Sequence, residues 1–200
     1  MIKKPMFTQA TQIQISLPGW LTEYSQRYTT CKDIHDRMGF VIEASRRNIL
    51  EQTGGPFAAA IFESKSGKLI SLGVNRVTTE KLSILHAEMI AITLAQRKLD
   101  TFDLGQGPTE LEIMTSTEPC AMCLGAIPWS GVRQVITGAT DADARETGFD
   151  EGAKISDWSG ALEDKGIKVI KEVNRNKAKQ VLLEYLENGG EIYNSCLNLD

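Results

Sequence analysis

The pairing of His86-Ala87-Glu88 with Pro119-Cys120-Ala121-Met122-Cys123 constrains this chain more than any other feature of its sequence. His86, Cys120 and Cys123 supply one imidazole and two thiolates, which are typical zinc ligands. Three protein ligands leave a tetrahedral zinc ion with one open position, and an open position is typical of a catalytic site. Glu88 adds a carboxylate that can carry a proton without binding the metal. We therefore predict one catalytic Zn²⁺ per chain.

The spacing of these residues indicates where they lie on their helices. Cys120 and Cys123 are three residues apart, which places both side chains on one face of a helix. A position near the helix N-terminus favours the thiolates that zinc binds, although a chance pair of core thiols or a redox pair is the alternative. His86 and Glu88 would point about 200° apart on a regular helix. We therefore expect His86 at the irregular start of its helix.

Composition and charge narrow the class of protein. The chain has 200 residues, of which 42% are hydrophobic and 24% charged, and this fits one globular domain with an apolar core. The net charge of −4 and the lack of a long Lys/Arg run argue against a nucleic-acid partner. The longest apolar run, residues 57–62, is too short to cross a membrane, and residues 1–8 do not resemble a secretory signal. We expect a cytoplasmic protein whose cysteines are thiols.

Hydrophobic periodicity predicts alternating helices and strands, and therefore a layered α/β domain. Residues 1–32 form a polar, irregular N-terminal extension packed on the domain, residues 33–187 form the catalytic domain, and residues 188–200 form a tail that covers the active site. Helices are expected over 33–52, 86–99, 119–129 and 174–187, and strands over 57–63, 68–74, 111–115, 132–138 and 167–173.

Several segments together resemble the cytidine and deoxycytidylate deaminase superfamily and, within it, the guanine deaminase branch. The segment 192–194 is also similar to a bacterial subgroup that acts on guanine and on the triazine ammeline. The zinc motif alone is shared by many deaminases, whereas Gly-Gly-Pro-Phe and Gly-Phe-Asp narrow the resemblance. The segments that carry it are Gly54–Ala60, Gly73–Val77, His86–Glu88, Glu118–Ser130 and Gly148–Gly152.

This resemblance implies a three-layer α/β/α fold with a central five-stranded mixed sheet, one Zn²⁺ and a homodimer. It also implies that five residues contact the substrate. Phe57, Asn75 and Trp129 have packing or turn-capping roles as their alternatives, and the path of the tail that carries Tyr193 cannot be derived. The implied roles are stacking for Phe57, a purine hydrogen bond for Asn75, a backbone N–H for Ala87, a pocket wall for Trp129 and closure for Tyr193.

The segment Asp141–Thr147 departs from the family pattern. The family carries acidic residues just before Gly-Phe-Asp, where they contact the base or relay protons. Asp143 matches one of these positions, and the resemblance implies that it contacts the substrate. The ammeline-competent subgroup has a Glu at the position that Arg145 occupies in this chain, and the next residue of this chain is Glu146. Glu146 is therefore the candidate second proton relay, and the departure weakens the expectation of ammeline turnover.

The predicted reaction is hydrolytic attack on an amidine-like ring carbon with loss of ammonia, in which Glu88 carries the proton. The expected substrate is a free purine base, guanine first, with ammeline as an additional substrate. The alternatives are a nucleoside deaminase acting on guanosine or cytidine, and a tRNA adenosine deaminase, for which a basic face would be expected. A non-catalytic zinc-fold subunit is a further alternative, but such a protein would not need Glu88.

Overall fold

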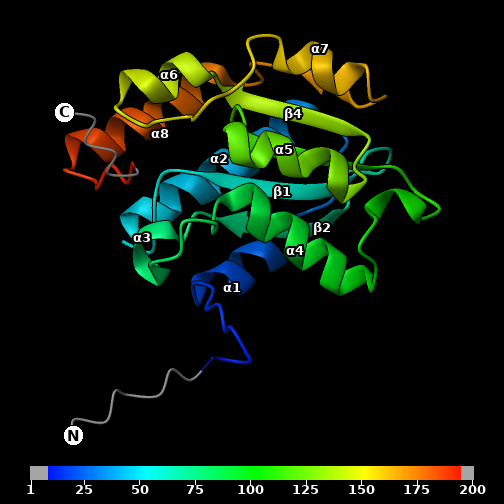
Figure 1. Cartoon of the computed structure of the whole chain (residues 1–200), viewed down its shortest axis with the longest axis horizontal. Coiled ribbons are helices and arrows are strands. Elements are labelled where there is room, and N and C mark those ends of the chain that lie inside the picture. The colour runs from blue at the N-terminus through cyan, green and yellow to red at the C-terminus, as the bar shows by residue number, and fades with distance from the viewer. Residues whose placement is uncertain (1–8, 195–200) are drawn as a thin grey trace, which may run out of the picture.

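Five strands form one mixed sheet in the order β2-β1-β3-β4-β5 in the computed structural model, which describes residues 9–194 (Figure 1). Strand β1 pairs antiparallel with β2 and with β3, whereas β3, β4 and β5 run parallel. This confirms the expected five-stranded mixed sheet. The strands are β1 (Ala58–Glu63), β2 (Leu69–Val74), β3 (Leu111–Thr117), β4 (Gln134–Ala139) and β5 (Lys168–Ile170).

Helices cover both faces of the sheet and complete the three layers (Figure 1). Helices α4 and α5 pack against each other, with α4 over β1 and β2, while α2 and α8 cover the opposite face. The helices are α1 (Trp20–Gln26), α2 (Ile34–Leu50), α3 (Val77–Glu80), α4 (Ala87–Leu99), α5 (Ala121–Ser130), α6 (Asp141–Glu146), α7 (Trp158–Glu163) and α8 (Arg175–Glu187), with a 3₁₀ turn at Leu104–Gln106.

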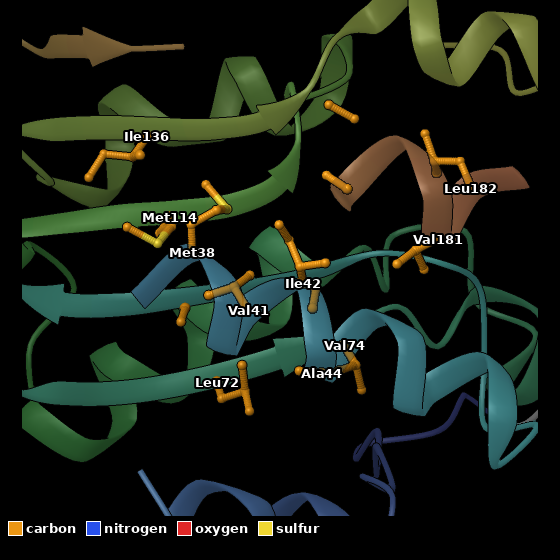
Figure 2. Close-up of a cluster of buried hydrophobic side chains, with 14 of the residues drawn as sticks. Met38, Val41, Ile42, Ala44, Leu72, Val74, Met114, Ile136, Val181 and Leu182 are labelled. Carbon is orange, nitrogen blue, oxygen red and sulfur yellow. The ribbon is translucent and has the colours of Figure 1, made fainter. Parts of the chain in front are cut away.

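The larger core lies between the sheet and the α2/α8 layer (Figure 2). Met38, Val41 and Ile42 point from α2 toward strand residues such as Met114 and Ile136, and these side chains are at most 2% exposed. The spacing of residues 38, 41 and 42 gives α2 the apolar face that the periodicity predicts. Full burial of one such side chain contributes about 1.5–3 kcal/mol, so this layer holds the sheet against which the site is built.

The helix that carries His86 lies unusually close to the sheet. Gly73 on β2 permits this, because a Cβ at that position would be 2.4 Å from Ala87 O and 2.6 Å from Ala91 N. Such distances are far inside van der Waals contact, so only glycine allows the start of α4 to pack there. The close packing of α4 on β2 thereby determines where His86 and Glu88, at the start of α4, lie relative to the sheet.

Four short elements were not expected from the sequence. Residues 1–32 were predicted to be irregular, but Trp20 and Leu21 are buried on α1, and the Trp20 indole N–H donates to Thr53 Oγ1 at 3.1 Å. Helices α3, α6 and α7 have four to six residues, too few for periodicity to reveal. Strand β5 is shorter than the predicted 167–173.

No helix among residues 9–194 is long and apolar enough to cross a membrane.

Candidate metal centre and active-site cavity

Two helix N-termini meet at the metal-binding motif. His86 is the N-cap residue of α4, with an extended backbone (φ −69°, ψ 155°), and Cys120 is the N-cap residue of α5 (φ −65°, ψ 172°). The predicted position of His86 at an irregular helix start is confirmed, and this position lets His86 and Glu88 face the same site. Pro119 was expected in the first turn of α5 but precedes the N-cap, so it directs the chain into the helix from outside.

The three predicted metal ligands lie together. His86 Nδ1, Cys120 Sγ and Cys123 Sγ are all within 4.8 Å of one another, and the first two atoms are 3.4 Å apart. Tetrahedral zinc with ordinary bond lengths requires ligand separations of about 3.5–3.8 Å, so small side-chain adjustments would seat the ion. One imidazole and two thiolates also match the donor types that zinc prefers. The residues therefore fit Zn²⁺, as predicted.

The two cysteines are chemically distinct. A hydrogen bond with Cys123 lowers the pKa of the Cys120 thiol to about 4, and the His86 ring acts in the same direction. The bond with Cys120, together with burial, raises the pKa of Cys123 well above its usual value. Cys120 is thus a thiolate at neutral pH, and a metal ion would displace the proton of Cys123 when it binds. The positive ends of the α4 and α5 dipoles favour this negative charge.

Glu88 lies beside the metal ligands at the start of α4 and is only 6% exposed. Thr115 Oγ1 donates to Glu88 Oε1 at 3.2 Å, and Cys123 Sγ lies 3.4 Å from Oε2. Burial raises the pKa of the Glu88 carboxyl. A carboxyl group that is buried, oriented and biased toward the protonated form is suited to accept and return a proton.

His86, Cys120 and Glu88 line a cavity of about 340 Å³, and Cys123 is buried behind its wall. Phe57 and Asn75 form part of its wall, at the start of β1 and the end of β2. The Phe57 ring packs edge-on against Phe149, with centroids 4.9 Å apart. An aromatic face and a carboxamide beside a metal site are suited to a flat, polar ring. The predicted cavity positions of Phe57 and Asn75 agree with the structure, while their contacts with substrate remain predictions.

The C-terminal segment reaches the cavity of its own chain. Tyr193 lines the cavity, and its hydroxyl accepts a hydrogen bond from Asn75 Nδ2 at 2.7 Å. Its ring lies edge-on to Phe149 at 5.3 Å and to His86 at 6.3 Å between centroids. The Asn194 side chain accepts from Asp150 N and donates to Gly148 O, both at 2.8 Å. These contacts hold residues 193 and 194 over the cavity; residues 195–200 lie outside the described part of the chain.

Asp143 and Glu146 do not line this cavity, which corrects their predicted roles. Asp143 is fully buried in a capping box with Thr140 at the start of α6. Its carboxylate accepts from Arg175 Nε at 2.8 Å and lies 3.0 Å from Lys179 Nζ. The Glu146 side chain is 63% exposed and also pairs with Lys179. Both acids form ion pairs with basic residues of α8, and these pairs attach α6 to α8.

Trp129 does not lie where it was expected, whereas the position of Ala87 is compatible with its predicted role. Trp129 is 85% exposed near the end of α5 and does not contribute to the cavity wall of its own chain. Ala87 is buried as the first residue of α4, so its N–H has no acceptor within the helix. A group beside His86 could accept from that N–H, and the role proposed for Ala87 remains a prediction.

Glu151 is the cavity residue that sequence reasoning missed. It lines the cavity and is 5% exposed, and burial is the main cause that raises its pKa to about 8. Its backbone carbonyl accepts from Ala121 N at 2.9 Å, which places it against the start of α5. Glu151 directly follows Gly-Phe-Asp, whereas the acids predicted from the sequence precede that motif. The chain turns immediately after Glu151, at Gly152, whose φ is +72°.

Comparison with known proteins identifies one family. The family model for the cytidine and deoxycytidylate deaminase zinc-binding region matches residues 32–139, which include every predicted metal ligand. A guanine deaminase from Bacillus subtilis is 43% identical over 98 residues, which are 49% of this chain and 59% of that relative. This match therefore spans less than two thirds of the curated relative's length.

Solved structures extend the similarity over most of the chain. A guanine deaminase from Nitrosomonas europaea superposes with a TM-score of 0.85 at 42% identity, covering 90% of this chain and all of that one. A mutant of the protein NE0047 in complex with 8-azaguanine also superposes with a TM-score of 0.85, at 43% identity, over 88% of this chain and 98% of that one. The similarity thus extends well beyond the zinc-binding region over 32–139.

Proposed function

Because the chain belongs to the cytidine and deoxycytidylate deaminase family, we propose that it is a zinc-dependent aminohydrolase that converts guanine and water to xanthine and ammonia. The similar proteins named as guanine deaminases, and the relative that binds 8-azaguanine, support a free purine as substrate. The observation that carries the chemistry is the buried carboxyl of Glu88, which lines the same cavity as His86 and Cys120 and lies 3.4 Å from the third metal ligand, Cys123.

Glu88 would act as the proton carrier. When bound by His86, Cys120 and Cys123, zinc supplies a water molecule whose pKa is lowered toward neutrality. Glu88 would accept one proton of this water as it adds to the ring carbon and pass it to a ring nitrogen. It would then carry the second proton, from the added hydroxyl, to the amino group, so that the carbon–nitrogen bond breaks, ammonia leaves, the carbonyl forms and the carboxylate is regenerated. Thr115 holds one oxygen of Glu88 by a hydrogen bond, which orients the other toward the cavity.

Phe57, Asn75 and Ala87 would bind the base. Stacking on the Phe57 ring is worth about 1–3 kcal/mol by analogy with aromatic contacts to single-stranded bases. The carboxamide of Asn75 offers both a donor and an acceptor for the purine edge, and the free N–H of Ala87 suits a substrate carbonyl. A base without a sugar needs such contacts on its ring, because nothing else is available to hold it.

Glu151 replaces Glu146 as the second proton relay in this proposal. Its side chain lies in the cavity, and desolvation keeps the carboxyl protonated to a higher pH than an exposed glutamate. A protonated acid on a second wall of the cavity can donate to the leaving amine or to a ring nitrogen. Lys179 instead holds Glu146 outside the site.

The tail supports a free base over a nucleoside. Tyr193 bonds to Asn75 and packs against Phe149, so residues 193 and 194 occupy the space above the base-binding groups. A ribose in that direction would displace this contact. The tRNA adenosine alternative would require still more of the tail to move, and two of the similar proteins described above carry the guanine deaminase name.

A second copy of the chain is the proposed partner. Helix α5 contains no charged residue, yet it exposes Met122 and Trp129 to solvent. Exposed apolar side chains on an uncharged helix are typical of a surface that another subunit covers. Trp129 would then contribute to the dimer and, through it, to the neighbour's pocket.

A site that depends on two thiols also suits the cytoplasm, where cysteines stay reduced, and we propose that the enzyme acts there.

The test is ammonia release by the zinc-loaded protein on guanine, ammeline, guanosine, cytidine and adenine. We expect turnover of guanine, with ammeline slower and the nucleosides inactive. Activity on a nucleoside but not on guanine would overturn the substrate assignment while keeping the zinc chemistry. Inactivity on all five would favour a non-catalytic zinc-fold subunit. The mass of the protein in solution, compared with that of Trp129→Arg, tests the homodimer.

A further inference from the structure

A buried amide on α2 connects the two segments that carry Phe57 and Asn75. Asn48 is fully buried, and its Nδ2 donates to Gly55 O at 2.8 Å and to Asn75 O at 2.9 Å. Gly55 lies two residues before Phe57. A single carboxamide therefore uses both of its N–H groups to join the turn before β1 to the end of β2.

The orientation of this amide is fixed by a chain of hydrogen bonds. Thr53 Oγ1 donates to Asn48 Oδ1 at 2.7 Å, and it receives the indole N–H of Trp20 at 3.1 Å. The Thr53 hydroxyl has one proton, so accepting from Trp20 leaves that proton for Asn48. The reversed amide would place its oxygen against two carbonyl oxygens and lose both bonds that Nδ2 donates. The Nδ2 group must therefore face Gly55 and Asn75.

The two joined segments also bond to each other. Phe57 N donates to Gly55 O at 2.9 Å, and Asn75 N donates to Phe57 O at 3.0 Å. The Asn75 side chain is held by Val77 N, which donates to its Oδ1 at 3.1 Å, so its Nδ2 points to Tyr193 in the cavity. The two bonds from Asn48 Nδ2 complete this set and hold the backbones of Gly55 and Asn75 together. The distance between the Phe57 ring and the Asn75 amide therefore depends on Asn48.

We propose that Asn48 is a positioning residue that sets the relative placement of Phe57 and Asn75, and thereby the affinity for the substrate base, without touching the substrate. Asn48 does not line the cavity. Its hydrogen bonds do not involve the metal ligands or Glu88. A change at Asn48 should therefore alter substrate binding and leave the chemical step and the zinc content unchanged. The inference rests on the proposed function, because it assumes that these two residues bind a purine.

The variant Asn48→Asp tests this with almost no change in volume. The aspartate has no N–H to offer, so two carbonyl oxygens would face a carboxyl oxygen. We expect the KM for guanine to rise by at least ~10-fold, kcat to change by less than ~3-fold, and zinc to remain at one per chain, because loss of a buried hydrogen bond acts here only on binding. Ser45→Ala is the matched control, because Ser45 is equally buried on α2 and bonds only to Ile42 O of the same helix.

A double-mutant cycle separates positioning from general destabilisation. If Asn48 acts through Asn75, the change Asn48→Asp should raise KM by less than ~3-fold in an Asn75→Ala background. An equal effect in both backgrounds, or an unchanged KM in Asn48→Asp, would overturn the inference. If Asn48→Asp does not fold, Thr53→Val serves in the same cycle, since it removes the bond that orients the amide; it also removes the acceptor of the Trp20 indole N–H, which lies outside the two joined segments. An unchanged KM in that variant would also count against the proposal. Lack of guanine turnover by the wild type would instead defeat the proposed function.

Discussion

Glu88 and Asp143 are both buried carboxyl groups near the N-terminus of a helix, yet their surroundings differ in kind. Asp143 is held by Thr140, Arg175 and Lys179, and the hydrogen bond from Arg175 is the main cause that lowers its pKa far below the usual range. Glu88 has no ion-pair partner among residues 9–194; burial raises its pKa, and its neighbours are Thr115 and Cys123.

The difference shows how to distinguish structural acids from catalytic ones in this fold. A carboxylate surrounded by cations stays ionised at all working pH values and cannot exchange a proton at useful rates. A carboxyl that is buried without a cation, and that faces a cavity, can do so. Glu151 resembles Glu88, because it is buried, lines the cavity and forms no ion pair among residues 9–194, although the charge of Lys154 acts on it. Glu146 resembles Asp143, because Lys179 pairs with both.

The largest effect is expected for Glu88→Gln. The amide keeps the size of the side chain and its contact with Thr115 but cannot carry a proton. Guanine turnover should fall by ~10²–10⁴-fold or more, with zinc content and thermal stability unchanged. Steady-state ammonia release with metal analysis measures both. Near-wild-type turnover would remove Glu88 from the mechanism and with it the contrast with Asp143.

A second comparison sharpens the assignment of the proton relay. Glu151→Gln should lower kcat by at least ~10²-fold, because it removes an acid from the cavity. Glu146→Gln is the matched control on the neighbouring segment and should retain wild-type kcat, since its side chain is exposed. The reverse result, with Glu146→Gln inactive and Glu151→Gln active, would restore the relay that the sequence suggested.

Phe57→Ala probes binding without touching either carboxyl group. Loss of stacking should weaken guanine binding by ~5–150-fold, which corresponds to ~1–3 kcal/mol, while zinc content is retained. The KM for guanine and the Kd for 8-azaguanine are the measurements. An unfolded protein would show that Phe57 serves mainly to pack against Phe149.

Asp143→Asn should affect stability and its pH dependence. The folded-state pKa of Asp143 is lowered, so its contribution is fully present above the unfolded pKa near 4 and is lost as the pH falls through the folded value. At pH 7 the variant should lose about 1–3 kcal/mol, and the difference from wild type should shrink below about pH 4. Denaturant unfolding at several pH values checks this; a difference independent of pH would show that the ion pairs with α8 contribute nothing.

The zinc site and the long helices could be predicted because their signals are local, whereas the five-stranded mixed sheet was implied by the resemblance to the deaminases. Metal ligands have fixed chemistry and spacing, and long helices such as α2 and α8 repeat their apolar residues often enough to be recognised. His86 and Glu88 could be placed together only by requiring an irregular helix start, and the N-cap position of His86 meets that requirement.

The second acid could not be predicted because its environment is tertiary. Nothing near Asp143 in the sequence reveals Arg175 and Lys179, which come from α8 more than 30 residues later. Glu151 is buried by a loop that returns to α5, and no periodic pattern marks such a loop. Trp129 was expected at a pocket wall, but it is 85% exposed on α5 and does not line the cavity of its own chain.

A crystal structure of the zinc-loaded protein with bound 8-azaguanine tests the central distinction between the two kinds of buried acid. We predict that the carboxyl groups of Glu88 and Glu151 lie within hydrogen-bond distance of 8-azaguanine or of the zinc-bound water. Asp143 should remain paired with Arg175. An 8-azaguanine ring contacted by Asp143 or Glu146, with Glu151 turned away from the cavity, would contradict the account.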